Sequence, residues 1–344
     1  MAGPVAVDRA GTAPEVANMN GTAIRARGLT KRYGTITAVA QVDLDVRAAS
    51  IFGLLGPNGA GKTTIIKLLT GLGDASAGEA EVAGFDVRRD PMRVKERIGW
   101  VAAEVILDDD FTAWENLWLQ AQLQRLKGWA ARAEELLRYF GLSDRRDDKV
   151  QTYSTGMRKK LEIALALLHQ PEVIFMDEPT IGLDASTRRM LWELIQGVNR
   201  EFGITVLLTT HYIEEADALC DHIAIIDHGR IVAHGTPTEL KARVGADFIE
   251  IATAEPVTAA TFSAVPGVLE IRSQGASWIL RVRSSEEVLP RLLGLLRTDG
   301  IRRLNVEKPS LETVFLDLTG QRLDTAGENI DYRKFYATMR RARG

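Results

Sequence analysis

The residues best suited to chemistry in this chain form one short loop, residues 56–63, with the sequence Gly-Pro-Asn-Gly-Ala-Gly-Lys-Thr. The spacing G-x-x-x-x-G-K-T is that of a loop that wraps the phosphates of a nucleoside triphosphate. Its glycines let successive backbone N–H groups converge on phosphate oxygens, and Lys62 adds a charge near the β- and γ-phosphates. The Thr63 hydroxyl is suited to Mg²⁺. Kinases, GTPases, helicases and transport ATPases all use such a loop, so the loop alone predicts only a bound triphosphate.

A pair of carboxylates follows an apolar run later in the chain. Residues 173–176 are apolar and lead into Asp177 and Glu178, which predicts a buried parallel strand that delivers acids at its C-terminal edge. We expect Asp177 to bind Mg²⁺ directly or through water, and Glu178 to orient the attacking water or accept its proton. A solvated turn could have the same sequence, but the phosphate loop upstream favours catalysis.

Two further polar positions belong to the same prediction. Residues 204–209 read as a second buried strand, and His211 follows it closely enough to reach a γ-phosphate at the same edge. Ser154 is placed as the N-cap of an apolar helix over residues 161–168, which leaves N–H groups at the helix start available to an anion. A cap with no further role is an equally good interpretation of Ser154.

The elements around these residues predict an α/β domain. A short strand over residues 50–55 and a helix over residues 63–72 flank the phosphate loop, and alternating residues over 23–47 predict an antiparallel meander. Tyr33 lies on the connection of that meander, where an aromatic ring could stack on adenine.

A helical insertion interrupts this α/β pattern. Thr112 and Glu115 form a capping box that opens a helical region running to about residue 140, with a break near Gly128. Its leucines, which include Leu117, Leu119 and Leu123, predict a face packed in the core rather than a groove for a partner.

Length and composition restrict the possibilities further. At 344 residues, two domains are expected, and the formal net charge of −3 gives no reason to expect nucleic acid as a partner. The single cysteine, Cys220, excludes an internal disulfide and fits a reducing compartment. No apolar run is long enough to span a bilayer. We therefore expect a cytoplasmic protein whose membrane part, if it has one, is another polypeptide.

The chain divides into four predicted segments. They are a disordered lead-in over residues 1–22, an ATPase domain over 23–244 with its helical insertion at about 105–165, a small α+β domain over 245–320, and a basic tail over 321–344. The order βαββαβ in the third segment predicts a ferredoxin-like fold. The role of this domain is left open between regulation, bracing of a dimer and simple packing.

Taken together, these motifs resemble the nucleotide-binding subunit of ATP-binding cassette (ABC) transporters over about residues 23–244, because six motifs occur in the family order. The ending over residues 310–320 resembles, more weakly, the daunorubicin-resistance type of exporter. The resemblance implies ATPase activity with ATP and Mg²⁺, and two cassettes packed head to tail. It also implies separate transmembrane permease subunits and a location on the cytoplasmic face of the membrane. The alternative is a soluble ABC-type ATPase that acts on a partner unrelated to transport.

The resemblance also assigns roles to individual residues. The catalytic residues are Glu178, His211 and Lys62. The metal-side residues are Thr63, Asp177 and Glu104. The nucleotide-binding residues are Tyr33, Gly56, Pro57, Asn58, Gly59, Ala60, Gly61, Lys62, Thr63, Thr64, Ser154, Thr155, Gly156, Met157 and Asp184. Of these, Ser154, Thr155, Gly156 and Met157 belong to the family signature, in which Ser154 and Gly156 would contact a nucleotide held by the other subunit.

Two departures from the family pattern stand out. The signature is usually Leu-Ser-Gly-Gly-Gln, and this chain differs at Tyr153, Thr155 and Met157. After the strand at 98–101, the family places a glutamine that contacts Mg²⁺ and reports to the membrane subunit, whereas this chain has Ala103. Either backbone and water replace that glutamine, or Glu104 provides the oxygen.

Overall fold

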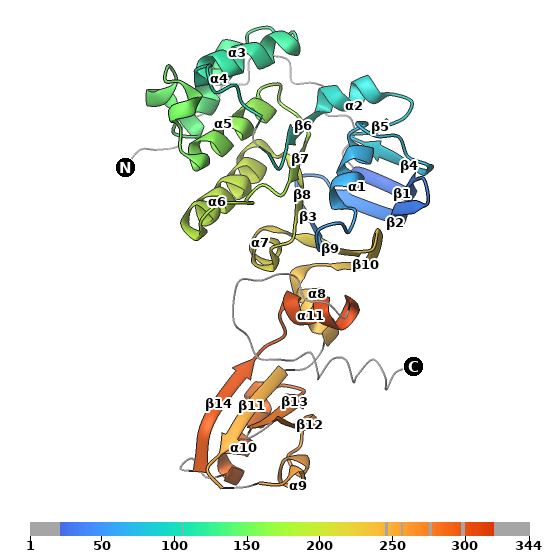
Figure 1. The fold of residues 1–344 in the computed structure, drawn as a ribbon, viewed down its shortest axis with the longest axis vertical. Coiled ribbons are helices and arrows are strands. Elements are labelled where there is room, and N and C mark those ends of the chain that lie inside the picture. Colours follow the sequence, from blue (N-terminus) through green and yellow to red (C-terminus); the bar gives the residue numbers. More distant parts are fainter. Residues whose placement is uncertain are drawn as a thin grey trace. The chain divides into compact units, whose positions relative to one another are not determined.

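The computed structural model describes residues 21–104, 106–244, 247–255, 257–274, 277–296 and 300–319 (Figure 1). Most of the predicted lead-in and the whole basic tail lie outside these residues. The described chain divides into two compact units. One contains residues 21–50, 64–176 and 193–207, and the other contains residues 51–63, 177–192 and 208–319, each within the described ranges.

The predicted meander is an antiparallel sheet in the first unit. Its strands are β1 (Thr22–Tyr33), β2 (Ile36–Arg47), β4 (Ala77–Val82) and β5 (Phe85–Asp86), in the order β2-β1-β4-β5. Alternating residues of β2 are buried, as the sequence pattern predicts for a sheet with one covered face. Tyr33 ends β1 and is 53% exposed.

The central sheet has six strands in the order β10-β9-β3-β8-β7-β6. They are β3 (Ile51–Leu55), β6 (Ile98–Val101), β7 (Val173–Asp177), β8 (Thr205–Thr210), β9 (His222–Asp227) and β10 (Arg230–Gly235). Every residue of β3, β7 and β8 is buried. Strands covered on both faces contain apolar runs in place of strict alternation, which is why these three were readable from the sequence.

The helical insertion contains α3 (Ala113–Leu123), α4 (Trp129–Tyr139) and α5 (Thr155–Leu167), which pack against one another (Figure 1). Two short 3₁₀ turns, η1 (Ser143–Arg145) and η2 (Val150–Thr152), precede α5. The capping box of Thr112 and Glu115 is confirmed. The predicted core face of α3 is wrong in part: Leu117 is buried, but Leu119 and Leu123 are exposed, because leucine spacing cannot tell a covered helix face from an open one.

The remaining helices of the cassette flank the sheets. They are α1 (Lys62–Leu69), α2 (Pro91–Arg97), α6 (Ala185–Phe202), α7 (Ile213–Leu219) and α8 (Pro237–Val244). None of the helices in the described chain combines the length and apolarity required to cross a membrane.

The C-terminal residues of the second unit form the predicted βαββαβ fold. Its elements are β11 (Asp247–Thr253), α9 (Ala259–Ser263), β12 (Val268–Gln274), β13 (Ser277–Val282), α10 (Ser285–Leu296) and β14 (Ile301–Glu307). The strand order β12-β13-β11-β14, with antiparallel neighbours, is that of a ferredoxin-like sheet. A last helix, α11 (Leu311–Thr319), packs against α8.

Candidate functional site

The phosphate loop connects the end of β3 to the start of α1, as predicted. Gly59 and Gly61 have φ angles of +81° and +101°, a region that side-chain-bearing residues rarely adopt. A Cβ atom on Gly56 would lie 2.3 Å from the carbonyl oxygen of Ile226 on β9. The loop is therefore restricted to glycine at these positions by its own conformation and by a close strand.

Lys62 is buried at the first position of α1, with only 4% of its surface exposed. Its Nζ donates to the carbonyl oxygens of Gly56 (2.8 Å) and Pro57 (3.1 Å) and lies 3.2 Å from Glu178 Oε1. Burial lowers the pKa of Lys62, and the Glu178 carboxylate opposes that effect. The Lys62 side chain is thus held beside the phosphate loop by two carbonyl oxygens and a carboxylate.

Asp177, the last residue of β7, accepts hydrogen bonds from two hydroxyl groups. Thr209 Oγ1 donates to Asp177 Oδ1 at 2.5 Å, and Thr63 Oγ1 donates to the same oxygen at 3.2 Å. Thr63 and Asp177 were both predicted on the metal side, and the structure brings them together. Thr209 was missed in the sequence, because it is a β-branched residue in a strand and nothing local distinguishes it.

Glu178 has an unusual backbone for a residue with a side chain. Its φ angle is +47°, and its N–H donates to both the carbonyl oxygen (3.1 Å) and the hydroxyl (3.0 Å) of Thr209. Such strain persists only where surrounding contacts impose it, and it is concentrated at functional sites. Here it turns the side chain away from the strand direction, so that Oε1 meets Lys62 and Oε2 lies 3.0 Å from His211 Nδ1.

Asp184 caps the helix that follows the carboxylates. It accepts from the N–H groups of Ser186 and Thr187 and from the Thr187 hydroxyl, which lowers its pKa. Asp184 is therefore the N-cap residue of α6.

A second residue that sequence reasoning missed is Glu215 on α7, which is fully buried. Its Oε1 accepts from the Thr180 hydroxyl (2.8 Å) and from the Trp192 indole (3.1 Å). Burial raises its pKa. Glu215 thereby anchors the loop that leaves Glu178, and its distance of 35 residues from Thr180 hides the contact in the sequence.

Other predicted positions lie in the first unit. Ser154 is the N-cap of α5 and accepts from the Met157 N–H at 3.3 Å, as predicted. Ser154 and Thr155 are exposed at the start of this 13-residue helix. Lys31 Nζ lies over the Tyr33 ring, 5.0 Å from the ring centre. Glu104 is exposed on the loop that follows β6.

The second unit therefore brings a lysine, two carboxylates and a histidine together beside a glycine-rich loop. They are Lys62, Asp177, Glu178 and His211. Lys62 can neutralise phosphate charge, and Glu178 can orient a water molecule or accept a proton from it. Comparison with known proteins agrees with this chemistry. A family model described as "ABC transporter" matches residues 39–181, and one described as "ATP-binding protein DrrA1-3-like, C-terminal domain" matches residues 235–319.

The daunorubicin resistance ATP-binding protein DrrA2 of Streptomyces coeruleorubidus is 40% identical over 321 residues, which cover 89% of this chain and 98% of the relative. The chain belongs to the ABC transporter ATP-binding subunits. This ABC subunit is also 37% identical to the linearmycin resistance ATP-binding protein LnrL of Bacillus subtilis strain 168, over 87% of its own length and 99% of the relative. It belongs to the daunorubicin-resistance branch of this family, and it is an ATPase.

Solved structures agree on the fold. One described as the ATP binding subunit of an ABC transporter is 29% identical, with a TM-score of 0.58, and covers 65% of this ABC subunit and 94% of that chain. The structure of cbiO1 from Clostridium perfringens has a TM-score of 0.61 at 24% identity, over 65% and 92% of the two chains. The predicted α/β phosphate-loop fold is confirmed.

Replacing Thr209 with valine is expected to lower kcat for ATP hydrolysis by about 10-fold or more, because a slightly misplaced catalytic group loses much of its effect. Valine keeps the shape of threonine but cannot donate to Asp177 or accept from the Glu178 N–H. Steady-state phosphate release would measure the loss, and Thr209→Ser, which keeps the hydroxyl, should restore most of the rate. Equal rates for Thr209→Val and the parent would refute this positioning role.

Proposed function

We propose that this ABC subunit hydrolyses Mg-ATP as one half of a head-to-tail pair and drives separate transmembrane chains that export their cargo. The main support for this proposal is that four side chains converge at the phosphate loop: Lys62, Asp177, Glu178 and His211. The assignment of the individual site residues, the pairing and the direction of transport are parts of this proposal.

The residues present fit Mg²⁺. A hydroxyl from Thr63 and a carboxylate from Asp177 already converge, and both are hard oxygen donors. Across the described ranges no group of three or more His, Cys, Asp and Glu side chains could enclose a metal. Mg²⁺ is commonly held by one or two carboxylates together with substrate phosphates, which matches this sparse donor set. When bound, the metal neutralises charge on the β- and γ-phosphates.

The protein residues then divide the remaining work. Lys62 binds the phosphates, Glu178 orients the attacking water and accepts its proton, and His211 holds the Glu178 side chain and reaches toward the γ-phosphate. The Thr209 hydroxyl donates to the Asp177 carboxylate and accepts from the backbone N–H of Glu178, so it keeps both residues in place. The backbone N–H groups of residues 59–63 provide the cradle, and Tyr33 stacks on adenine.

The pairing is supported by the start of α5. Ser154 and Thr155 are exposed at a helix N-terminus, where N–H groups and the helix dipole favour an anion. We propose that Ser154, Thr155, Gly156 and Met157 of one subunit contact the triphosphate held by the other. Asp184, exposed at the start of α6, belongs to the loop that crosses between subunits.

Export is supported by the relatives, which are described as resistance proteins for daunorubicin and linearmycin, and by a Nod factor export protein that is 36% identical. We propose a cargo of that amphipathic type and a place on the cytoplasmic face of the membrane. Exposed apolar side chains on and near α3, namely Ile106, Trp118, Leu119 and Leu123, support a contact with the membrane chains.

Affinity purification of the subunit from detergent-solubilised membranes tests this proposal. We expect a protein with several membrane spans to co-purify, together with an ATPase rate that depends on Mg²⁺. Recovery with ribosomes or other soluble material in place of a membrane protein would favour the alternative, a soluble ABC-type ATPase. The adjacent open reading frame should encode that membrane protein.

Glu104 carries a separate prediction, because Ala103 offers no side-chain oxygen. If Glu104 supplies the missing oxygen, Glu104→Ala should raise the Mg²⁺ concentration needed for half-maximal ATPase rate about 10-fold. Loss of a group that supports a metal site typically weakens metal affinity by this much. Glu104→Gln keeps an oxygen and serves as the matched control. An unchanged rate and metal affinity in Glu104→Ala would leave the backbone and water as the substitute for the family's glutamine.

A further inference from the structure

A buried ion pair lies on α5, directly after the signature residues at the start of the helix. Lys159 Nζ donates to Glu162 Oε2 at 2.7 Å, and their side chains are only 3% and 7% exposed. An ion pair buried this deeply adds little to stability, because desolvation of both charges offsets their attraction. Stability alone therefore does not account for a lysine and a glutamate at these two positions.

The remaining hydrogen bonds of the pair go to one loop. We call residues 102–104 and 106–112, between β6 and α3, the β6–α3 loop. Lys159 Nζ also donates to the carbonyl oxygen of Ala102 at 3.1 Å. Burial raises the pKa of Glu162, while Lys159 and the backbone N–H groups of Ile106 and Ala102 lower it. The pair is thus hydrogen-bonded to the loop backbone on both sides of Ala103, at Ala102 and at Ile106.

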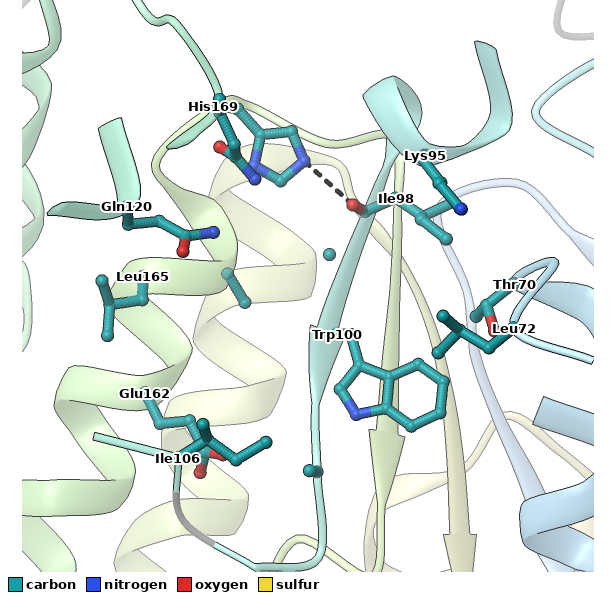
Figure 2. Close-up of a pocket in the computed structure, with 14 residues that line it drawn as sticks. Thr70, Leu72, Lys95, Ile98, Trp100, Ile106, Gln120, Glu162, Leu165 and His169 are labelled. Carbon is teal, nitrogen blue, oxygen red and sulfur yellow. Dashed lines mark hydrogen bonds between the residues drawn. The ribbon is translucent and has the colours of Figure 1, made fainter. Parts of the chain in front are cut away.

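The same loop borders a cavity of about 320 Å³ on the surface of the first unit. Figure 2 shows Glu162 beside Ile106 in its wall, with Trp100 and Gln120 among the other lining residues. Arg158 adds an exposed link from α5 to the loop, 2.6 Å from Asp109. Exposed pairs contribute little, so the loop is held to α5 mainly by the hydrogen bonds that Lys159 and Glu162 make with its backbone.

We propose that Lys159 and Glu162 are positioning residues that fasten the β6–α3 loop to α5, so that the loop and the signature residues 154–157 move together. The inference rests on the proposed function, in which residues 154–157 contact the partner's nucleotide. It gives this chain a mechanical link at the point where Ala103 replaces a glutamine. A continuous helix carries the displacement, since α5 runs unbroken from Thr155 to Leu167.

The test compares the full-length parent with Lys159→Met/Glu162→Leu, which removes both charges together and leaves no unpaired ion. Hydrogen–deuterium exchange is measured with and without magnesium and a slowly hydrolysed ATP analogue, on peptides covering residues 56–63, 102–112 and 154–158. In the parent, we expect nucleotide to protect all three. In the variant, we expect residues 56–63 and 154–158 to stay protected and protection of residues 102–112 to be lost.

Kinetics supply a readout that a purely structural role would not change. Measured per nucleotide-binding site, kcat should fall roughly 10-fold, with KM for ATP within about 2-fold. The signature still binds the nucleotide, but without the loop to position it the reacting geometry is impaired, whereas the phosphate loop is not affected. Lys159→Arg, which keeps the donors, should restore kcat. Arg132→Met/Glu135→Leu removes a more exposed i,i+3 pair on α4 and should behave as the parent.

Each outcome decides a different point. If residues 102–112 and 154–158 still respond together in the double variant at the parent's kcat, the link does not exist. If the parent shows no protection of residues 56–63, the proposed function is wrong, independently of the link. Should the double variant fail to fold, Lys159→Glu/Glu162→Lys keeps an ion pair without an acceptor for the loop N–H groups, and it must uncouple the loop in the same way.

Discussion

Replacing Glu178 with glutamine is expected to lower kcat for ATP hydrolysis by about 10²- to 10⁴-fold, the usual contribution of a general base. Glutamine has nearly the same shape and can still accept a hydrogen bond from Lys62, but it cannot take a proton from water. ATP binding should therefore persist, and the proposed pair should be trapped in its closed form. Phosphate release, binding of a fluorescent ATP analogue and light scattering after size exclusion with Mg-ATP would measure the three effects.

Glu214 provides the matched control for this substitution. It lies next to Glu215 at the start of α7 but is exposed. Glu214→Gln should hydrolyse ATP at the parent rate and remain in the parent's oligomeric state. Hydrolysis by Glu178→Gln at the parent rate would show that another group activates the water.

Replacing Lys62 with methionine is expected to weaken ATP binding about 100-fold, or about 2.7 kcal/mol, within the range measured for losing one partner of a buried charge pair. Methionine preserves much of the side-chain volume but removes the charge between Glu178 and the phosphate loop. Calorimetric titration with ATP would measure the affinity. Lys67→Met, on the exposed side of the same helix, should bind ATP as the parent does.

The Lys62 substitution also leaves Glu178 without its cationic partner in a site that is only 13% exposed for that side chain. We expect a lower midpoint of thermal unfolding for Lys62→Met, and recovery of that midpoint in Lys62→Met/Glu178→Gln, because the unpaired charge is then gone. Hydrolysis should not recover in the double variant. Parent-like ATP affinity in Lys62→Met would remove Lys62 from the binding site.

Much of the fold was predictable because its signals are local. Each of these signals depends on residues within a few positions of one another. They are the capping boxes at Thr112 and Thr236, the helix cap at Ser154 and the hairpin turn at His228 and Gly229. The buried strands were predictable for another reason: both faces are covered, so each contains an apolar run and lacks strict alternation with polar residues. The leucines of α3 show the limit, since their spacing does not reveal whether anything covers them.

The sequence by itself determined the chemistry of this protein: a glycine-rich loop ending in Lys62 and Thr63, carboxylates after an apolar strand and a histidine after another. Spacing along the chain is sufficient there, because each motif is a strand end joined to a loop. Only the tertiary structure decided how the parts meet. The hydroxyl of Thr209 bonds both to Asp177, 32 residues earlier in the chain, and to the N–H of Glu178. Glu178 adopts a strained backbone to face Lys62 and His211, and Lys159 and Glu162 hold the loop beside Ala103. The physical reason is that hydrogen bonds and burial depend on distance in space, which neighbouring letters of the sequence do not record.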